Sequence, residues 1–537
     1  MELYGNLHRG TQRLLPLCIL IPFLSVVVSD QMEVGVLINF KKIVVKDPNG
    51  ALTTWSVKDS DPCSWSGVEC DKNFHVSGLA LPSQQLVGSI STDLGDLQFL
   101  RKIDLSGNTF TGVFPMSLLN CKRLERIDLS GNQFYGSLPD DFQRLPRLLS
   151  LKLNKNDFTG NLPNSFSPRL EVLDLSTNRL TGGITLDFGR LRNLTTINLF
   201  GNLLTGVVPG SLTKCKVLRR LDLSNNNLEG PIPFDLGILK RMRFLSLAGN
   251  NINGSIPSTL GNCKWMTKLN FSGNQLSGEI PQEVGYLTLL DSLDFSGNRL
   301  AGEIPASLGN MTKLERLNLG NNLIEGIIPT ELGEVLALTH LFLNGNELSG
   351  DIPQSLSTCV NLTMMSLAGN KLTGAFPTVF GALLNLKDLS LARIIADSVG
   401  NLSTLKVLNL SGNTIGGAIP ESLGMLLHIE SIDLSENNFH GKIPLQLGGL
   451  KTLKYLDFAN NKLVGDIPDG LGNLEELETL DLHNNQLEGK IPKSLTGIPT
   501  LENVNMSSNH LRGLIPSYGA FSHLKESSFM ENPEPLW

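Results

Sequence analysis

The chain has 537 residues, of which 41% are hydrophobic and 18% are charged, a composition that excludes an intrinsically disordered protein. This length exceeds that of one ordinary globular core and suits an elongated array of repeats. The formal net charge of −7 gives no support to nucleic-acid binding, which requires a basic face.

The first element, residues 1–29, is predicted to be a secretory signal peptide. Arg9 and Arg13 form a basic segment, and an apolar run of about 15 residues follows, from Leu14 to Val28. A plausible small-residue cleavage site ends at Ser29. Because the run is shorter than the roughly 18–20 residues that span a bilayer, cleavage is favoured over a short membrane anchor. No later apolar run is long enough to cross a membrane, so we expect no membrane span in the mature chain.

Residues 30–75 are expected to form an N-terminal cap that begins with a short helix. The segment 31–46 carries apolar residues at roughly helical spacing, at Val34, Leu37, Ile38 and Ile43. The turn sequence Asp47-Pro48-Asn49-Gly50 is expected to stop this helix.

Two of the seven cysteines, Cys63 and Cys70, lie close together in a secreted context, which predicts a disulfide between them. The first repeat of an array has an apolar end without a neighbour. A helix together with Trp55 and Trp65, held by a short disulfide loop, would cover that end. The alternative, a cysteine-based redox or metal site, lacks further ligands. We therefore expect no metal and no cofactor.

A unit of 24 residues then repeats about nineteen times across residues 76–516. In the copy Leu218–Pro233, Leu221 and Leu223 alternate with outward residues as in a strand, and Asn226 follows where the chain must turn. The amide of this asparagine is expected to bond backbone groups of the turn, so that stacked copies form a ladder. A glycine and an Ile-Pro pair then turn the chain onto the convex side. The pattern predicts an α/β solenoid, a right-handed superhelix with a parallel β-sheet on its concave face.

The cap sequence W-x7-C-x-W-x-G-V-x-C, from Trp55 to Cys70, resembles that of plant leucine-rich-repeat receptor kinases and receptor-like proteins. The G-x-hydrophobic-P element of the repeats, as at Gly254–Pro257, resembles the plant-specific class of leucine-rich repeat. The resemblance covers Asp30 to about Phe529. It implies a second short strand in each repeat and a superhelical twist.

The resemblance also implies a function outside the cell. Long arrays of this family bind a peptide or another small signal on the inner face and then recruit a co-receptor that has a short leucine-rich-repeat ectodomain. This chain lacks the non-repeat island of the steroid-binding members, so a peptide ligand is favoured. We expect an extracellular ligand-recognition region on the outer side of the plasma membrane or in the apoplast.

Four further cysteines lie 13 residues after the asparagine of their repeat, where other copies have leucine. They are Cys121, Cys215, Cys263 and Cys359. Because they replace a buried leucine, they are predicted to be buried free thiols.

One repeat is shortened. Asn413 follows Asn370 by 43 residues, where two full copies need 48, so about five residues are missing near Arg393. Either the solenoid has a local kink there or the gene model contains an error.

No catalytic motif accompanies the repeats. The tripeptide Asp187-Phe188-Gly189 matches a kinase metal-binding motif, but the glycine-rich loop and catalytic loop of a kinase are absent, so the match is attributed to chance. The chain is predicted not to be an enzyme.

Outward strand positions are where ligand binding is expected, because they line the concave face. Two groups depart from the common Asp and Ser at these positions. The first contains His340, Phe342, Asn344, Met364 and Ser366. The second contains Phe200 and Phe244, near Arg220 and Arg243. Exposed aromatic and Met side chains on a groove wall favour a peptide-binding strip, whereas isolated surface hydrophobic residues are common.

Eight N-x-S/T sequons fit a secreted glycoprotein. They lie at Asn193, Asn253, Asn270, Asn310, Asn361, Asn401, Asn409 and Asn505. Asn270, Asn409 and Asn505 fall on outward strand positions, where a glycan would obstruct the groove. Such short patterns also arise by chance in a sequence rich in Asn and Ser.

The segment 517–537 resembles the exit from the array in this family, but no cysteine follows Glu531-Asn532-Pro533. A truncated product of a receptor gene is favoured over a secreted protein with an improvised end. The alternative functions are a secreted inhibitor similar to polygalacturonase-inhibiting proteins, whose arrays are about half as long, and a decoy or structural wall protein.

Overall fold

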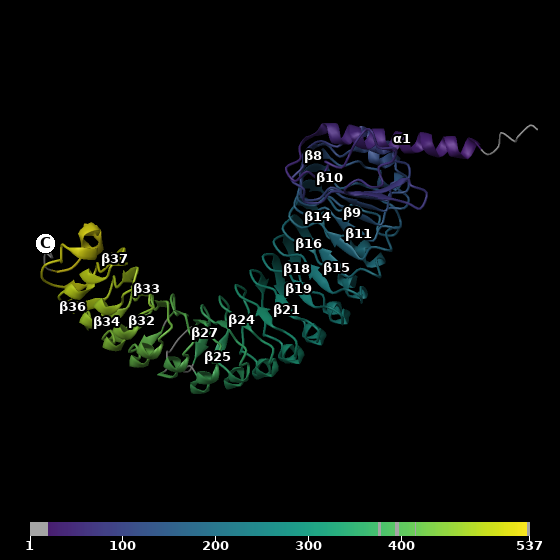
Figure 1. The fold of residues 1–537 in the computed structure, drawn as a ribbon. Coiled ribbons are helices and arrows are strands. Elements are labelled where there is room, and N and C mark those ends of the chain that lie inside the picture. The colour runs from purple at the N-terminus through teal and green to yellow at the C-terminus, as the bar shows by residue number, and fades with distance from the viewer. Residues whose placement is uncertain (1–19, 374–376, 392–396, 414, 534–537) are drawn as a thin grey trace, which may run out of the picture. The chain divides into compact units, whose positions relative to one another are not determined.

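The computed structural model describes residues 20–373, 377–391, 397–413 and 415–533, with side chains described from residue 31 onward. The chain divides into two compact units. The first comprises Met1–Thr181 and Thr185–Leu194, and the second comprises Gly182–Ile184 and Thr195–Trp537. Within each unit, successive repeats stack one after the other along the chain (Figure 1).

Each repeat adds one strand to a parallel sheet, here called the first sheet. In the first unit its strands are β3 (Val76–Ala80), β5 (Lys102–Asp104), β7 (Arg126–Asp128), β9 (Ser150–Lys152) and β11 (Val172–Asp174). In the second unit they are β13 (Thr196–Asn198), β15 (Arg220–Asp222), β17 (Phe244–Ser246), β19 (Lys268–Asn270), β21 (Ser292–Asp294), β23 (Arg316–Asn318), β24 (His340–Phe342), β26 (Met364–Ser366), β28 (Asp388–Ser390), β29 (Val407–Asn409), β31 (Ser431–Asp433), β33 (Tyr455–Asp457), β35 (Thr479–Asp481) and β37 (Asn503–Asn505).

A second strand follows the asparagine of most repeats, as the plant-type repeat implies, and these strands form several separate sheets that are together called the second sheet. In the first unit they are β4 (Val87–Gly88), β6 (Thr109–Gly112), β8 (Gln133–Ser137) and β10 (Asp157–Asn161), while β12 spans Arg179–Gly182. In the second unit they are β14 (Leu203–Val207), β16 (Asn227–Pro231), β18 (Asn251–Gly254), β20 (Gln275–Gly278), β22 (Arg299–Leu300), β25 (Ser349–Asp351), β27 (Lys371–Thr373), β30 (Gly416–Gly417), β32 (Asn438–Gly441), β34 (Lys462–Asp466), β36 (Gln486–Gly489) and β38 (His510–Leu511).

Most repeats close with a short 3-10 helix that starts after the proline. These helices are η2 (Thr92–Asp96), η3 (Met116–Asn120), η4 (Phe142–Arg144), η5 (Gly210–Lys214), η6 (Phe234–Ile238), η7 (Ser258–Asn262), η8 (Gln282–Tyr286), η9 (Ala306–Asn310), η10 (Thr330–Glu334), η11 (Gln354–Thr358), η12 (Thr378–Ala382), η13 (Asp397–Asn401), η14 (Glu421–Met425), η15 (Leu445–Gly449), η16 (Asp469–Asn473) and η17 (Lys493–Gly497). Two more, η18 (Gly519–His523) and η19 (Glu526–Phe529), follow the last strand. The prediction of a leucine-rich-repeat solenoid with a parallel sheet is confirmed. The repeat count and the domain boundaries stay predictions.

The cap contains a helix longer than expected. Helix α1 (Leu20–Ile43) begins within the predicted signal segment, and the structure does not test cleavage there. The expected helical segment 31–46 ends early, because Val44–Lys46 forms β1, which pairs antiparallel with β4. Strand pairing suits the β-branched pair Val44-Val45, which explains the change from helix to strand. Within the described residues, no helix has the length and apolar character that crossing a membrane requires.

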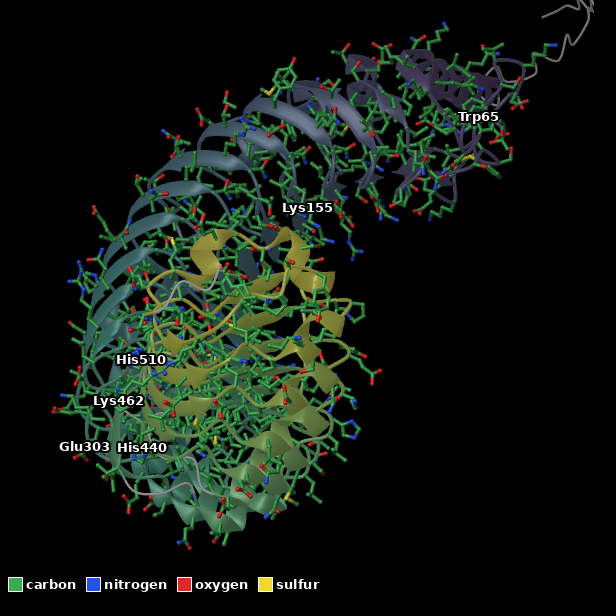
Figure 2. All side chains as sticks on the ribbon, turned by 90° about the vertical axis from the view of Figure 1, so that its left-hand side faces the viewer. Trp65, Lys155, Glu303, His440, Lys462 and His510 are labelled. Atoms are coloured by element: carbon green, nitrogen blue, oxygen red, sulfur yellow. A yellow bond between two sulfur atoms is a disulfide. The ribbon has the colours of Figure 1, made fainter. Side chains whose placement is uncertain are left out.

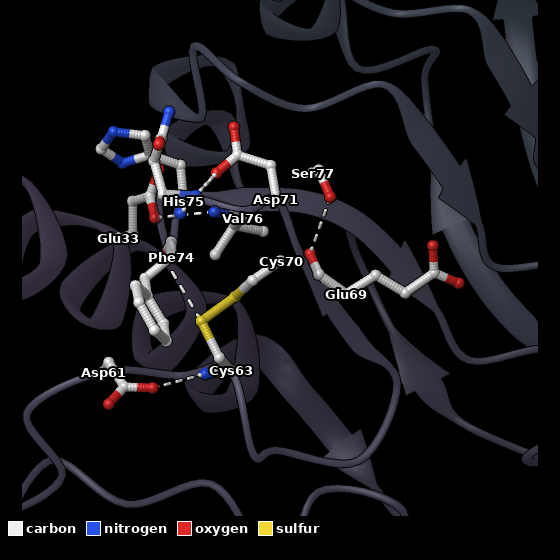
Figure 3. The surroundings of a disulfide bond; sticks show 11 residues. Glu33, Asp61, Cys63, Glu69, Cys70, Asp71, Phe74, His75, Val76 and Ser77 are labelled. Carbon is white, nitrogen blue, oxygen red and sulfur yellow. Dashed lines mark hydrogen bonds between the residues drawn. A yellow bond between two sulfur atoms is a disulfide. The ribbon is translucent and has the colours of Figure 1, made fainter.

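The predicted disulfide is confirmed: Cys63 and Cys70 are bonded (Figure 3). Cys70 ends β2 (Val68–Cys70), which pairs antiparallel with β3, so the loop is fastened to the first strand of the array. Trp55 and Trp65 are buried, and their rings stack at 5.3 Å between centroids. These contacts cover the apolar end of the first repeat, as the sequence predicts.

Buried asparagines tie each repeat to the one before it. Asn226 Oδ1 accepts from the Leu204 backbone N–H at 3.1 Å. Its Nδ2 donates to three carbonyls, that of Leu199 at 3.0 Å, that of Leu223 at 3.1 Å and that of Ser224 at 3.2 Å. The same pattern recurs at Asn250 and most other copies, so the predicted ladder is confirmed.

The shortened repeat keeps the first sheet continuous. Asp388 of β28 lies opposite Val407 of β29, in unbroken parallel register. Asn413 reaches the Leu391 carbonyl, 22 residues upstream, whereas Asn437 reaches its equivalent partner 27 residues upstream. The five missing residues therefore come from the segment after β28. Arg393 lies outside the described residues.

The four cysteines of the array form no disulfide within the described residues and are buried, as predicted. Burial raises the pKa of the Cys121 thiol to about 12 and that of Cys215, Cys263 and Cys359 to about 11. The thiolate is the reactive form, so both inaccessibility and protonation protect these groups.

Replacing Asn226 with Ala is expected to favour local unfolding of the repeat. The Leu204 N–H loses its acceptor, and an unsatisfied buried donor costs about 2 kcal/mol, which raises the equilibrium constant for local opening roughly thirtyfold. Hydrogen exchange of the Leu204 amide measures this directly. Asn227→Ala, which changes an exposed neighbour, should leave the exchange rate unchanged, and equal rates in both variants would contradict the role of the ladder.

Iodoacetamide at pH 8 should label none of Cys121, Cys215, Cys263 and Cys359 in the folded protein. Their raised pKa values keep them protonated well above that pH, and burial excludes the reagent. After unfolding in guanidinium chloride all four should react. Peptide mass spectrometry identifies the labelled positions, and labelling of any of them before unfolding would show that its repeat is not closed.

Candidate functional site

The first predicted group comes together on the outward face of the first sheet. On β24, His340 lies opposite Arg316 and Met364, and Phe342 lies opposite Asn318 and Ser366. Leu341 between them is fully buried, so alternation along the strand points both rings outward. His340, Phe342, Met364 and Ser366 are half-buried on this face. We call His340, Phe342 and Met364 the aromatic strip.

Asn344 lies beyond the end of β24 and belongs to the turn. Its carbonyl oxygen accepts from the Asn321 N–H at 2.7 Å and from the Asn346 side chain at 3.3 Å. Its backbone therefore has a structural role, and its half-buried side chain borders the strip.

The Phe342 ring carries a cation on its face. The Arg316 guanidinium carbon lies 4.9 Å from the ring centroid, and the His340 ring lies 6.0 Å away at a tilted angle. A cation over an aromatic face is attracted by the ring quadrupole. The strip therefore offers a ligand both an aromatic edge and a positive charge.

The surroundings of His340 favour its neutral form. Burial lowers its pKa below the usual 6.5, and the Arg316 charge lowers it further, while Asp388 acts in the opposite direction. Thr339 Oγ1 donates its only proton to the Glu315 carbonyl at 2.8 Å and lies 2.8 Å from His340 Nδ1. Nδ1 must therefore carry the proton, which leaves Nε2 of the neutral ring as an acceptor.

The two phenylalanines of the second predicted group lie two strands apart. Phe244 lies on β17, where Arg220 packs over its ring at 3.7 Å from the centroid. Phe200 follows the end of β13 and is 37% exposed. Strand β15 lies between β13 and β17, so the two phenylalanines belong to different places on the sheet. The expected proximity of Phe244 to Arg220 is confirmed, and ligand binding by Phe200 or Phe244 stays a prediction.

Two clusters were missed by the sequence analysis. One is a cleft of about 230 Å³ lined by Arg219, Arg241, Arg243 and Trp265. The other is an acidic row on β31, β33 and β35, where Asp457 lies in register between Asp433 and Asp481. Both consist of like residues at the same or nearby offsets in consecutive repeats, and that periodicity is the signal that would have found them.

The acidic row has hydrogen-bond partners within its own repeats. The Tyr455 hydroxyl donates to Asp457 at 2.9 Å, and His483 Nδ1 lies 2.7 Å from Asp481. Burial raises the Asp457 pKa, and the two neighbouring aspartates raise it further. Among the described residues, no group of three or more His, Cys, Asp or Glu side chains is arranged to hold a metal ion.

The sequons fall into two structural classes. Asn193, Asn253, Asn310, Asn361 and Asn401 are exposed. Asn270, Asn409 and Asn505 are half-buried on the first sheet, as expected, and each accepts a hydrogen bond from the backbone of the serine two residues on. Glycosylation of any of them stays a prediction.

Family models match most of the chain. The leucine-rich repeat region matches residues 190–373 and 380–513, and the leucine rich repeat N-terminal domain matches residues 30–71. A probable LRR receptor-like serine/threonine-protein kinase of Arabidopsis thaliana is 46% identical over 69 residues, which are 13% of this chain and 9% of that protein. A probable inactive leucine-rich repeat receptor-like protein kinase of the same plant is 34% identical over 103 residues, 19% of this chain and 15% of that protein. The chain thus matches less than a fifth of the length of either relative.

Solved structures align over nearly the whole chain. The PEPR1–AtPEP1 crystal structure superposes with a TM-score of 0.70 and 32% identity, covering 91% of this chain and 80% of that one. The Arabidopsis receptor kinase HAESA, crystallised with the peptide hormone IDA and the co-receptor SERK1, gives a TM-score of 0.68 and 31% identity, covering 94% of this chain and 98% of that one.

The His340 ring should titrate below pH 6.5, because burial and Arg316 both disfavour its charged form. Arg316→Gln should raise the pKa toward 6.5, and Asp388→Asn should lower it further. Proton NMR of the His340 ring measures each midpoint. A midpoint that neither substitution moves would contradict this electrostatic account.

Proposed function

The chain belongs to the family of plant leucine-rich-repeat receptor ectodomains, and from this premise we propose that it is an extracellular ligand-recognition region that binds a peptide on the outward face of its first sheet. The observation that carries the proposal is the aromatic strip on β24 and β26, where His340, Phe342 and Met364 form a half-exposed surface on a rigid scaffold. Amphipathic anchors of this kind supply most of the energy of peptide interfaces.

The similar structures support the choice of ligand. PEPR1 is crystallised with AtPEP1, and HAESA with a peptide hormone and a co-receptor. We propose that this chain likewise takes an extracellular peptide or protein ligand and then a co-receptor that has a short leucine-rich-repeat ectodomain. The proposed location is the outer side of the plasma membrane or the apoplast.

The proposed role is binding rather than catalysis. The relatives are named receptor-like kinases, two of them inactive or probably inactive, and the repeats of this chain match the leucine-rich repeat models. In a solenoid, function lies in the outward side chains of the sheet. The signal therefore passes through ligand and co-receptor contacts.

Peptides selected from a phage library of random 12-residue sequences on the immobilised full chain should depend on the aromatic strip. His340→Ala with Phe342→Ala is expected to weaken their binding at least about tenfold, because central aromatic residues carry most of such binding energy. Biolayer interferometry with the synthetic peptides measures the affinities.

The matched control is His440→Ala with Val464→Ala. These residues lie on β32 and β34 of the second sheet, where Figure 2 shows His440 and Lys462 beside each other in paired strands. The control should bind like the wild type. Equal losses in both double variants, or none in either, would overturn the assignment of the strip.

A further inference from the structure

We infer that the cleft formed by Arg219, Arg241, Arg243 and Trp265 is an anion subsite that holds acidic side chains of the ligand; this rests on the proposed function. The repeat places these residues together. Arg243 follows Arg219 by one 24-residue unit, and Trp265 follows Arg241 by the same interval. The Arg243 N–H donates to the Arg219 carbonyl at 2.8 Å, so their backbones are adjacent.

The guanidinium groups of Arg219, Arg241 and Arg243 form no ion pair with the described residues. Arg220 is paired with Asp222 at 2.9 Å and stacks on Phe244. Arg219 and Arg243 lie just before β15 and β17, at equivalent positions of neighbouring repeats, so their like charges repel each other, and an anion between them removes that repulsion.

Trp265 supplies the apolar wall of the cleft. Its side chain is 58% exposed, whereas Trp55 and Trp65 of the cap are buried. An exposed indole beside guanidinium groups can pack against the methylene groups of a Glu side chain while the carboxylate meets the arginines. The combination selects an acidic group carried on an apolar stem over a free inorganic ion.

The basic surface is short, which favours a peptide over an acidic polysaccharide. In the row that contains Arg219 and Arg243, the preceding residue is Thr195, and the following ones are Thr267, Asp291 and Glu315. The row thus changes sign within two repeats after Arg243. A long polyanion would meet these carboxylates, whereas one or two acidic side chains would not.

The cleft also fixes a spacing within the ligand. Strands β17 and β24 are four steps apart in the first sheet, through β19, β21 and β23. At about 4.8 Å per step this is ~19 Å, the length of about six extended residues. An acidic segment in the cleft would therefore lie about six residues from the segment that covers Phe342.

The test uses the full chain and an acetylated, amidated tetraglutamate peptide. We expect it to change the Trp265 fluorescence and to bind at least about tenfold more tightly than tetraglutamine at low salt, an advantage that falls as salt is added. Arg219→Gln with Arg243→Gln should lose that advantage. Arg299→Gln with Arg512→Gln removes the same charge at exposed positions elsewhere and should retain it.

Equal binding of tetraglutamate and tetraglutamine, or equal binding by both double variants, would overturn the subsite. Tetragalacturonate that binds more tightly than tetraglutamate would overturn the choice of a peptide. Thermal melting of each variant confirms that it is folded. Because the aromatic strip is tested with separate variants and separate peptides, failure of the cleft is distinguishable from failure of the proposed function.

Discussion

The hydrogen bonds of the buried asparagines are the constraint on which the whole array depends. Each strand of the first sheet is only a few residues long, and the turn after it leaves backbone groups inside the solenoid without sheet partners. A single amide, such as that of Asn226, accepts from one turn N–H and donates to carbonyls of its own and the preceding repeat. Burying these groups unsatisfied would cost more than the short strands supply. The ladder therefore fixes both the turn and the stacking of neighbours.

Because the buried residues stabilise the fold, the outward positions of the first sheet can vary. Leu221 and its equivalents are buried completely, and the asparagines complete the interior, so the residues between them need only tolerate solvent and one another. Many copies hold an aspartate that accepts from a serine two residues later, as Asp104 does from Ser106. His340, Phe342 and Met364 depart from that arrangement without disturbing the strand register, which is what a binding surface on a fixed scaffold requires.

The fold could be predicted almost completely, because burial imposes a repeat that the sequence must show at every copy. The disulfide followed from the short spacing of two cysteines in a secreted context. The buried thiols and the strand position of His340 and Phe342 followed from their offsets within the repeat. The features that the sequence did not predict depend on the direction of side chains and on contacts with residues about 24 positions away. The pattern gives both Phe200 and Phe244 outward positions, yet Phe200 follows the end of β13, two strands from β17. The helix α1 ended early because Val44–Lys46 found a strand partner in β4. The periodicity of the sequence predicts neither the separation of Phe200 from Phe244 nor the pairing of β1 with β4.

Rows of like charges at the same position of consecutive repeats help to distinguish structural residues from binding residues in such a solenoid. The register places them about one strand spacing apart, so each row of like charges must be balanced or remain costly. In the row around Asp457, the Tyr455 hydroxyl donates to Asp457, His483 lies beside Asp481, and burial together with the neighbouring aspartates raises the Asp457 pKa. Arg219 and Arg243 take part in none of the ion pairs among the described residues. The buried asparagines of the array have partners within the chain. We propose that the anion opposite Arg219 and Arg243 is instead an acidic group of the ligand.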